Sequence, residues 1–299
     1  MSPGPAGLGG PRITPEELKA FSQYVHHLTG IWLDETKGYL LESRLGGLLR
    51  DQGCASFSEL LYRIRGDGTR RTERTLIDLI TTNETLFFRD QAPFELIQHK
   101  VLPDLIDQRT RAQRTPGPVP LRIWSAACST GQEVYSIAMV LTELLGGSGR
   151  FQVRLLGTDI SDQAVAAASR GVYNRIEIER GLPPDKLQRY FTPTPEGTWK
   201  VRDQLRAMAT FRRLNLMEDF GALGRFDIIC CRNVAIYFTE QDRKSLFTRL
   251  ERNLEPDGYL LVGATESLSG LCPQYVSFRY LRSVYYQIGR TAPGVPAAR

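Results

Sequence analysis

From residue 121 onward, short apolar runs alternate with helix-forming stretches, and this alternation constrains the fold more than any other feature of the chain. Strands are predicted at 121–124, 153–158, 211–214, 226–231 and 259–262, helices at 133–145, 161–170 and 240–253, and a turn at 256–258. Two later runs, 275–281 and 283–288, suit an antiparallel pair. Alternating strands and helices predict an α/β fold, in which a parallel sheet carries helices on both faces.

Two parts of the chain depart from this alternation. Residues 13–80 show helical spacing without β-type alternation, beginning with Thr14 as a cap, Pro15 in the first turn and Glu17 completing a capping box. The proline-rich stretch 172–210 predicts a helix and a hairpin, with strands at 198–202 and 205–208. The expected organisation is a disordered tail (1–12), an all-α domain (13–80), a linker with a connecting helix (81–120), an α/β domain (121–290) with a small β-subdomain inserted at 172–210, and a tail (291–299).

Composition narrows the class of protein. The 299 residues are 41% hydrophobic and 24% charged, the balance of a soluble globular protein of about two domains. No apolar stretch reaches the roughly 18 residues of a membrane helix, and the N-terminus lacks a secretory pattern. Five cysteines without C-x-x-C spacing and three histidines argue against a zinc ribbon or a disulfide scaffold. We therefore expect a cytoplasmic location and no bound metal. The net charge of +5 permits an acidic partner without requiring nucleic acid.

Polar side chains follow the first two predicted strands. Small residues at 126–131, including Ala126 and Gly131, leave room for a ligand, and Glu133 places a carboxylate at a helix N-terminus. One glycine and an acid suit a cofactor without phosphates, and they disfavour a nicotinamide cofactor, whose site needs more glycines. Asp159 ends the next strand, where a carboxylate can bind ribose hydroxyls. The alternatives are a tight turn without a ligand and an Asp that caps the following helix.

Later segments add candidates of the same kind. Asn215 and Leu216 follow the third strand and could flank an adenine ring, although a plain turn is the alternative. Asn233 and Tyr237 are four residues apart, so one helical turn would place both over the cleft. Segment 81–90 is polar, then aromatic, then cationic; a linker with two buried phenylalanines is the alternative. Cys230 and Cys231 suit core packing. A basic run, either a solvated face or a surface for an acidic partner, comprises Arg63, Arg65, Arg70, Arg71 and Arg74.

Taken together, these motifs resemble a known family. They are TTNETLFFRD (81–90), IWSAACSTGQEVYSIA (123–138), GTDIS (157–161), NL (215–216), FDIICCRNVAIYF (226–238) and LEPDGYLLVGATES (254–267). Their order and spacing resemble the CheR-type chemotaxis receptor methyltransferases, which transfer a methyl group from S-adenosylmethionine to glutamate side chains of chemoreceptors. The resemblance covers about residues 13–286 and implies a helical domain, a Rossmann-like class I methyltransferase sheet and an inserted β-subdomain.

The resemblance also implies roles for residues. The expected cofactor shell is Asn83, Thr85, Arg89, Glu133, Asp159, Asn215, Leu216, Asn233 and Val234, to which the small-residue loop adds Ala126 and Gly131. Arg89 and Tyr237 resemble the pair proposed to position the substrate. The expected product is S-adenosylhomocysteine, and the expected partners are the cytoplasmic methylation helices of chemoreceptors. The protein is expected to be a monomer that does not insert into the membrane. A non-catalytic module that binds S-adenosylmethionine is the alternative, and methylation of RNA is disfavoured by the modest charge.

One segment departs from the family pattern. Members that tether to the receptor's C-terminal pentapeptide have a longer, glycine-containing loop in the β-subdomain. Here the loop 192–198 is short and lacks G-x-G. The sequence therefore predicts methylation that does not depend on the pentapeptide.

Overall fold

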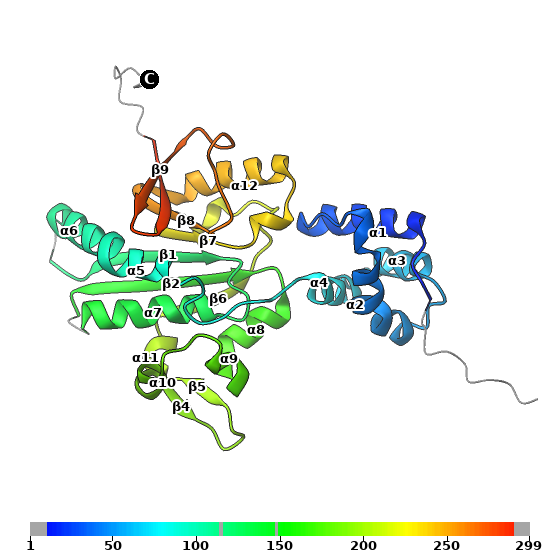
Figure 1. Cartoon of the computed structure of the whole chain (residues 1–299), viewed down its shortest axis with the longest axis horizontal. Helices are drawn as coiled ribbons and strands as arrows, with labels where there is room; N and C mark the ends of the chain where they lie inside the picture. The colour runs from blue at the N-terminus through cyan, green and yellow to red at the C-terminus, as the bar shows by residue number, and fades with distance from the viewer. Residues whose placement is uncertain (1–10, 114–115, 147–148, 290–299) are drawn as a thin grey trace, which may run out of the picture.

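The first part of the chain folds into helices with their own core. The computed structural model describes residues 11–113, 116–146 and 149–289, so the predicted tails fall outside the described residues except for positions 11 and 12. The helices are α1 (Pro15–Thr29), η1 (Glu35–Lys37), α2 (Gly38–Asp51), α3 (Phe57–Gly66) and α4 (Arg71–Ile80). Phe21, Leu45 and Leu60 lie fully buried where these helices meet. We call this part the helical domain; it lies at the right in Figure 1.

The start and end of α1 follow from local sequence. Thr14 accepts a hydrogen bond from the Glu17 amide, and the Glu17 carboxylate accepts one from the Thr14 amide. Gly30 then ends the helix in the left-handed conformation, which glycine adopts without steric cost. The capping box predicted from the sequence is confirmed.

A seven-stranded sheet forms the centre of the second part. Its strands are β1 (Val119–Ala126), β2 (Phe151–Asp159), β6 (Ala209–Arg213), β7 (Phe226–Cys231), β8 (Leu254–Val262), β9 (Tyr275–Tyr280) and β10 (Ser283–Ile288). They lie in the order β6-β2-β1-β7-β8-β10-β9, and all neighbours are parallel except β10, which is antiparallel to both β8 and β9. The α/β fold and the antiparallel end are as predicted.

Helices cover both faces of this sheet (Figure 1). They are α5 (Ala92–Leu96), η2 (Ile97–Val101), α6 (Leu102–Ala112), α7 (Gln132–Leu145), α8 (Asp162–Arg170) and α12 (Glu240–Asn253). Leu121 and Ile123 of β1 pack with α5–α7, whereas Trp124 and Ala126 belong to a second apolar cluster that includes α12. Because neighbouring strand residues point to opposite faces, β1 contributes to both cores. No helix of the described part is long and apolar enough to cross a membrane.

A small three-stranded sheet is inserted before β6. The segment comprises β3 (Val172–Tyr173), α9 (Arg175–Glu179), α10 (Pro184–Tyr190), β4 (Phe191–Pro193), β5 (Trp199–Val201) and α11 (Asp203–Arg206), with β5 antiparallel to both β3 and β4. The predicted hairpin partner at 205–208 is wrong, because β5 pairs with β4 and residues 203–206 form a helical turn. Leu205 is fully buried in the cluster that contains α7. A four-residue segment with three apolar residues does not distinguish a strand from such a turn.

The predicted turn at 256–258 is also corrected. These residues lie inside β8, which directly follows α12. Phe226 pairs with Leu254, but Ile228 already pairs with Tyr259, so the strand bulges between these two points. A Cβ at Gly258 would lie 2.9 Å from the Leu254 side chain, so a glycine at this position gives the bulge the space that it needs.

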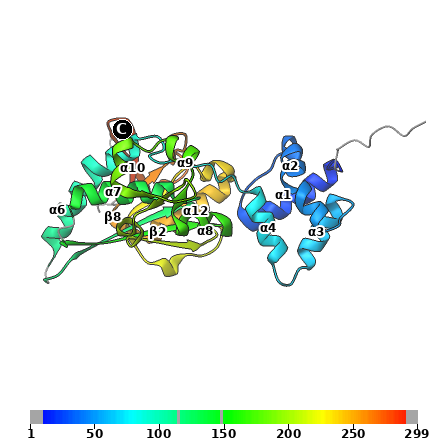
Figure 2. The same cartoon turned by 90° about the horizontal axis from the view of Figure 1, so that it is seen from below.

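The helical domain contacts the sheet domain along the end of β7. Ile31 forms an isolated antiparallel bridge with Phe238, which follows η4 (Ala235–Tyr237). Beside it, His26 Nε2 lies 2.7 Å from Asp242 Oδ2 on α12. Both views place the helical domain beside the sheet, at the same end as α12 and α8 (Figures 1 and 2). These contacts bring the helical domain to the edge where the parallel strands end.

Candidate functional site between the helical domain and the sheet

A cavity lies between the helical domain and the carboxyl ends of β1, β2, β6 and β7, with about 900 Å³ of empty space, part of it open to solvent. Segment 81–89 contributes Asn83, Thr85 and Arg89, and the first two strand ends contribute Glu133 and Asp159. The third and fourth strand ends contribute Asn215, Leu216, Asn233, Val234 and Tyr237. Ligands of parallel sheets bind at this edge. The fold therefore brings ten predicted site residues to one cavity.

Two predicted residues do not line the cavity. Ala126 is buried in the core of the sheet, where its side chain packs in the cluster with α12. Gly131 precedes α7 at φ +93°, and a Cβ there would lie 2.8 Å from the Ala168 Cβ. The glycine is thus required by backbone conformation and by the close approach of α8, and not by room for a ligand.

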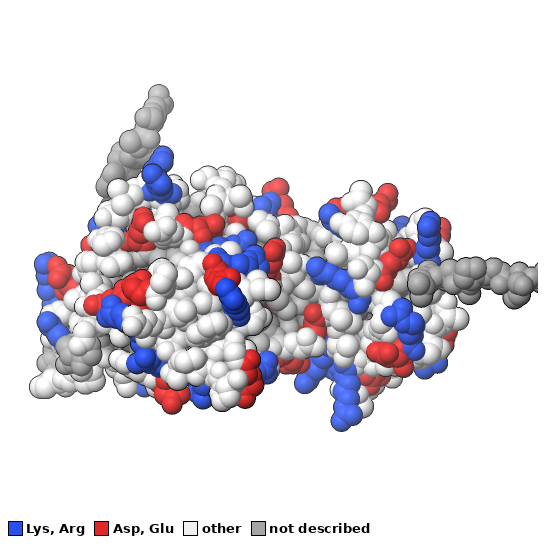
Figure 3. Space-filling model, turned by 60° about the horizontal axis from the view of Figure 1, so that its bottom comes forward, with Lys and Arg blue, Asp and Glu red and all other residues white. Residues whose placement is uncertain are grey.

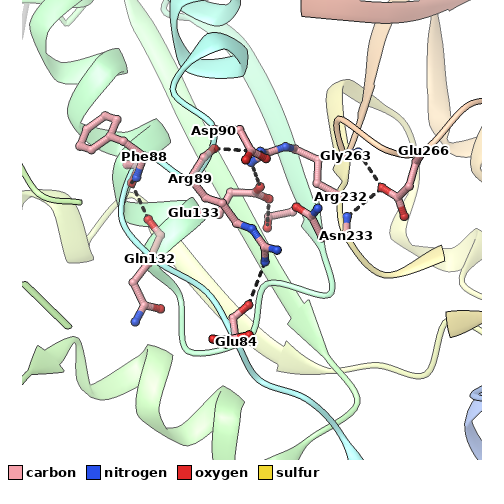
Figure 4. A network of polar contacts seen from close by, with 12 residues as sticks. Glu84, Phe88, Arg89, Asp90, Gln132, Glu133, Arg232, Asn233, Gly263 and Glu266 are labelled. Atoms are coloured by element: carbon pink, nitrogen blue, oxygen red, sulfur yellow. Dashed lines mark hydrogen bonds and ion pairs between the residues drawn. The ribbon is translucent and has the colours of Figure 1, made fainter. Parts of the chain in front are cut away.

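Arg232 lines the cavity and forms the centre of a polar network in its wall (Figure 4). Its Nη1 donates to Glu133 Oε2 at 2.7 Å, and its Nη2 donates to Asp90 Oδ2 at 2.8 Å and to the Arg89 carbonyl at 2.9 Å. The Arg232 side chain is only 3% exposed. Glu133 also accepts from Ser125 Oγ at 2.7 Å. The network joins β7, α7 and segment 81–90, so it fixes three walls of the cavity relative to each other.

Asp159 is held by the backbone on both sides. Its two oxygens accept hydrogen bonds from the amides of Ser129, at 2.8 Å, and Ser161, at 3.0 Å. Burial raises the pKa of Asp159, against the lowering effect of these amides. The carboxylate therefore organises the loops after β1 and β2 in addition to facing the cavity; the alternative that Asp159 caps the following helix is wrong, because Ser161 is the N-cap of α8 and accepts from the Ala164 amide.

Asn215 connects the two domains. Its Nδ2 donates to the Leu28 carbonyl of α1 at 2.8 Å, and its Oδ1 accepts from the Met217 amide at 3.0 Å. Both ends of the side-chain amide are thus engaged within the protein. These contacts orient the side chain, and because an amide oxygen has a second acceptor position, the role of Asn215 toward an adenine ring stays a prediction. Leu216 beside it offers an apolar wall.

Arg89 and Tyr237 line the same cavity and come from different segments of the chain. Arg89 Nη1 donates to the Glu84 carbonyl at 2.9 Å, so the guanidinium bends back over segment 81–90 (Figure 4). Tyr237 is 38% exposed, and its carbonyl accepts from the Trp32 amide of the helical domain at 3.0 Å. A partly exposed hydroxyl and a cation at one cavity can both reach an incoming carboxylate.

Backbone strain is concentrated around the cavity. Eight described residues other than glycine have positive φ, and six of them border the cavity segments: Phe88, Asp90, Gln91, Ala127, Ser129 and Asn233. Such conformations cost about 1–3 kcal/mol each and persist where the surroundings enforce them, as at functional sites. The network of Arg232 and the amides bound by Asp159 supply that enforcement.

The cysteines near the cavity are not nucleophiles. Cys128 lines the cavity but is 2% exposed, and burial raises the pKa of its thiol well above the ordinary value. Cys230 and Cys231 are fully buried with similarly raised pKa values, which agrees with their prediction as core residues. Within the described ranges, no three His, Cys, Asp or Glu side chains form a cluster suited to a metal.

Some residues at the site are not predicted from the sequence. Arg232 stands within a quoted motif, but only the fold reveals that it is buried against Glu133. A cationic residue directly after a fully buried strand is a signal that could identify it. Thr29 and Ile31 line the cavity from the helical domain, and no motif indicates that contact.

Two family models match the chain. The CheR methyltransferase SAM binding domain matches residues 83–281, and the CheR methyltransferase all-alpha domain matches residues 16–81. Chemotaxis protein methyltransferase Cher2 of Pseudomonas putida is 39% identical over 274 residues, covering 91% of this chain and 97% of that protein. Chemotaxis protein methyltransferase 1 of Pseudomonas aeruginosa is 38% identical over 276 residues, covering 91% and 97%. The corresponding protein of Vibrio parahaemolyticus is 36% identical over 278 residues, covering 92% and 98%.

Proposed function

This chain belongs to the CheR methyltransferase family, with S-adenosylmethionine as its cofactor, and from that premise we propose that it methylates glutamate side chains of chemoreceptors. The product would be a glutamyl methyl ester that adjusts receptor signalling during sensory adaptation. The observation that carries the proposal is the single cavity that combines Glu133 and Asp159 with Arg89 and Tyr237.

The residues of the cavity fit this cofactor. Glu133 lies in the first turn of α7, which follows β1, and Asp159 is the last residue of β2. Both carboxylates line the cavity, where they can accept hydrogen bonds from a ribose or from a cationic amino acid group. Ile160, Leu214 and Leu216 offer an apolar wall for a purine ring. The loop after β1 has no glycine-rich phosphate cradle, and the cofactor has no phosphate. We therefore assign these residues to cofactor binding, together with Asn83, Thr85, Asn233 and Val234.

The chemistry needs alignment more than proton transfer. When bound, the cofactor supplies an electrophilic methyl group on a sulfonium. A glutamate, with a pKa of about 4.3, is already ionised at neutral pH, so the enzyme does not need a general base. This requirement agrees with a cavity whose nearest thiol, Cys128, is kept protonated by burial. Holding the carboxylate in line with the methyl group can lower the barrier by several kcal/mol.

Arg89 and Tyr237 are the side chains proposed for that alignment. The Arg89 guanidinium can attract the incoming carboxylate, and the Tyr237 hydroxyl can fix one of its oxygens. Arg89→Ala and Tyr237→Phe should each reduce turnover at saturating cofactor. If both variants bind the cofactor normally and retain full turnover, the assignment of these two residues is wrong.

A basic face of the helical domain is the proposed docking surface for the acidic receptor helices. Basic side chains are visible on this domain, interspersed with acidic ones (Figure 3). Arg63 pairs with Glu59 at 3.1 Å, and Arg65 lies over the Tyr24 ring, so both are partly engaged. Arg70, Arg71 and Arg74 are the main candidates for receptor contact; Arg74 lies 3.8 Å from Asp162 in a loose pair and its side chain is still 56% exposed.

We further propose that methylation does not require the receptor's C-terminal pentapeptide. The turn between β4 and β5 is confined to residues 194–198 and closed by a hydrogen bond from the Thr194 amide to the Thr198 carbonyl. A receptor fragment without the pentapeptide should be methylated as fast as the complete receptor. A large drop in rate would contradict this proposal. The protein is expected to act as a cytoplasmic monomer, which light scattering would test for the oligomeric state.

The decisive assay is methyl transfer from labelled S-adenosylmethionine to a purified chemoreceptor signalling fragment. We expect incorporation of label that alkali releases as methanol, because carboxyl methyl esters are hydrolysed by base. Saturable cofactor binding without transfer to any chemoreceptor would instead favour a non-catalytic signalling module.

A further inference from the structure

Glu266 lies outside the cavity but contacts the segment that forms one of its walls. It follows β8 in a tight turn that is closed by a hydrogen bond from the Glu266 amide to the Gly263 carbonyl at 2.9 Å. Its Oε2 accepts from the Asn233 amide at 2.8 Å and from the Gly263 amide at 2.6 Å (Figure 4). One carboxylate oxygen thus joins the end of β8 to the residue that follows Arg232 after β7.

The contact supports an unusual backbone conformation at Asn233. Its φ is +58°, in the left-handed region, which asparagine adopts more readily than most residues with a side chain but which still lies outside the common regions. The segment that Asn233 begins supplies several cavity residues: Asn233, Val234, Tyr237 and Phe238. The amide bound by Glu266 therefore lies at the base of the wall that carries Tyr237.

Gly263 shows how close this contact is. A Cβ at position 263 would lie 2.6 Å from Glu266 Oε2, 2.8 Å from Asn233 Nδ2 and 2.9 Å from the Asn233 amide nitrogen. The φ of Gly263 is not in the left-handed region, so the glycine serves space and not backbone freedom. Glu266, Gly263 and Asn233 therefore depend on one another sterically.

The wall is held at both ends. Arg232 anchors its start to Glu133 and Asp90. At its end, Phe238 pairs with Ile31 of the helical domain and the Tyr237 carbonyl accepts from the Trp32 amide. Between them, Glu266 is the side chain that binds a backbone amide of the wall. The other oxygen of Glu266, Oε1, is buried and has no hydrogen-bond partner among the described residues. The carboxylate is thus committed to Asn233 and Gly263.

We propose that Glu266 is a positioning residue for methyl transfer, which holds Asn233 in its left-handed conformation and thereby places the wall of residues 233–237 for cofactor and acceptor. Gly263 is the space that this contact requires. The inference rests on the proposed function only in taking the cavity as the site of methyl transfer. Glu266 does not touch the cavity and acts through Asn233.

The test compares four variants of the full chain by calorimetric titration with S-adenosylhomocysteine. In Glu266→Ala the dissociation constant should rise about tenfold, because the Asn233 amide loses the carboxylate oxygen that accepts its hydrogen bond. Glu266→Gln retains an oxygen that can accept from both amides, so it should stay within about threefold of wild type. Thr265→Ala alters an exposed neighbour in the same turn and should change nothing.

Gly263→Ala provides an independent route to the same effect, since it displaces the contact while Glu266 is still present. Like Glu266→Ala, it should raise the dissociation constant for S-adenosylhomocysteine. It also provides a test of the proposal if Glu266→Ala does not fold. Hydrogen exchange of the Asn233 amide, measured without cofactor, should accelerate in both variants and not in Glu266→Gln. Turnover of Glu266→Ala at saturating cofactor should fall as well, because Tyr237 moves with the wall.

Two results would overturn the proposal. One is a folded Glu266→Ala or Gly263→Ala protein with wild-type affinity and wild-type exchange at Asn233. The other is an equal loss in Glu266→Gln and Glu266→Ala, which would assign the effect to charge and not to the hydrogen-bond acceptor. Failure of the wild type to methylate receptors would refute the proposed function alone, since the binding comparison does not use a receptor.

Discussion

Replacing Arg232 tests whether the network in the wall of the cavity holds the site together. Arg232→Met keeps an unbranched apolar stem while removing the guanidinium. The change breaks three hydrogen bonds, two of them to carboxylates at 2.7 and 2.8 Å. It leaves Glu133, whose side chain is 14% exposed, without its cation, whereas Asp90 at 38% can turn to solvent.

The magnitude follows from which charge stays buried. Removing one partner of a buried ion pair costs about 3–5 kcal/mol, because the other charge is left uncompensated. Since Asp90 is partly solvated, we expect the lower end, a loss of about 3 kcal/mol in the free energy of unfolding. The matched control is Arg63→Met, whose pair with Glu59 is exposed on both sides and should contribute less than about 1 kcal/mol.

Urea unfolding followed by circular dichroism measures both losses. Glu133→Gln and the double variant with Arg232→Met complete a double-mutant cycle, in which we expect a coupling energy above about 1 kcal/mol. The reasoning is refuted if Arg232→Met costs no more than the Arg63 control, or if the two substitutions at the network are simply additive.

Three further predictions concern binding and pH. Asp159→Ala removes the acceptor for two loop amides, so calorimetry should show affinity for S-adenosylhomocysteine reduced by at least about tenfold; unchanged affinity would exclude Asp159 from the site. Burial raises the pKa of Asp242, but hydrogen bonds from Thr239 and a histidine of α1 lower it overall. Because the folded-state pKa is depressed, Asp242 stabilises the protein above its unfolded pKa of about 3.9, and this contribution is lost as pH falls through the folded value. Asp242→Asn should therefore be less stable than wild type by about 1 kcal/mol at pH near 6 and should converge with it in acid; a gap that is constant with pH would contradict this. Reversing Arg70, Arg71 and Arg74 to Glu should raise the KM for receptor about tenfold and leave cofactor affinity unchanged, whereas an unchanged KM would remove the docking surface.

Features set by nearby residues can be predicted from the sequence. The capping box of Thr14 and Glu17 joins residues three positions apart. The helix start that carries Glu133 and the strand end that carries Asp159 follow from local hydrophobic patterns. In a parallel sheet the carboxyl ends of the strands meet at one edge, so most residues of the candidate site can be predicted from the sequence. The resemblance to a family adds the prediction that Asn83, Thr85 and Arg89 of segment 81–90 belong to the site.

Features that depend on distant partners cannot be predicted in this way. Arg232 is 99 positions from Glu133 and 142 from Asp90, so its burial is a property of the fold. The Asn215 amide donates to the Leu28 carbonyl, 187 positions away, a contact between the two domains that its place after a strand does not indicate. Gly131 is constrained by the approach of α8, a contact that no local pattern encodes.

The proposed function of this cavity is methyl transfer to receptor glutamates. Mass spectrometry of a chemoreceptor fragment incubated with the purified protein and S-adenosylmethionine tests it directly. The account predicts a gain of one methyl group at particular glutamates, absent when those glutamates are replaced by glutamine and strongly reduced with Tyr237→Phe. Unmodified glutamates beside a wild-type protein that binds the cofactor, or methylation at another residue type, would contradict it.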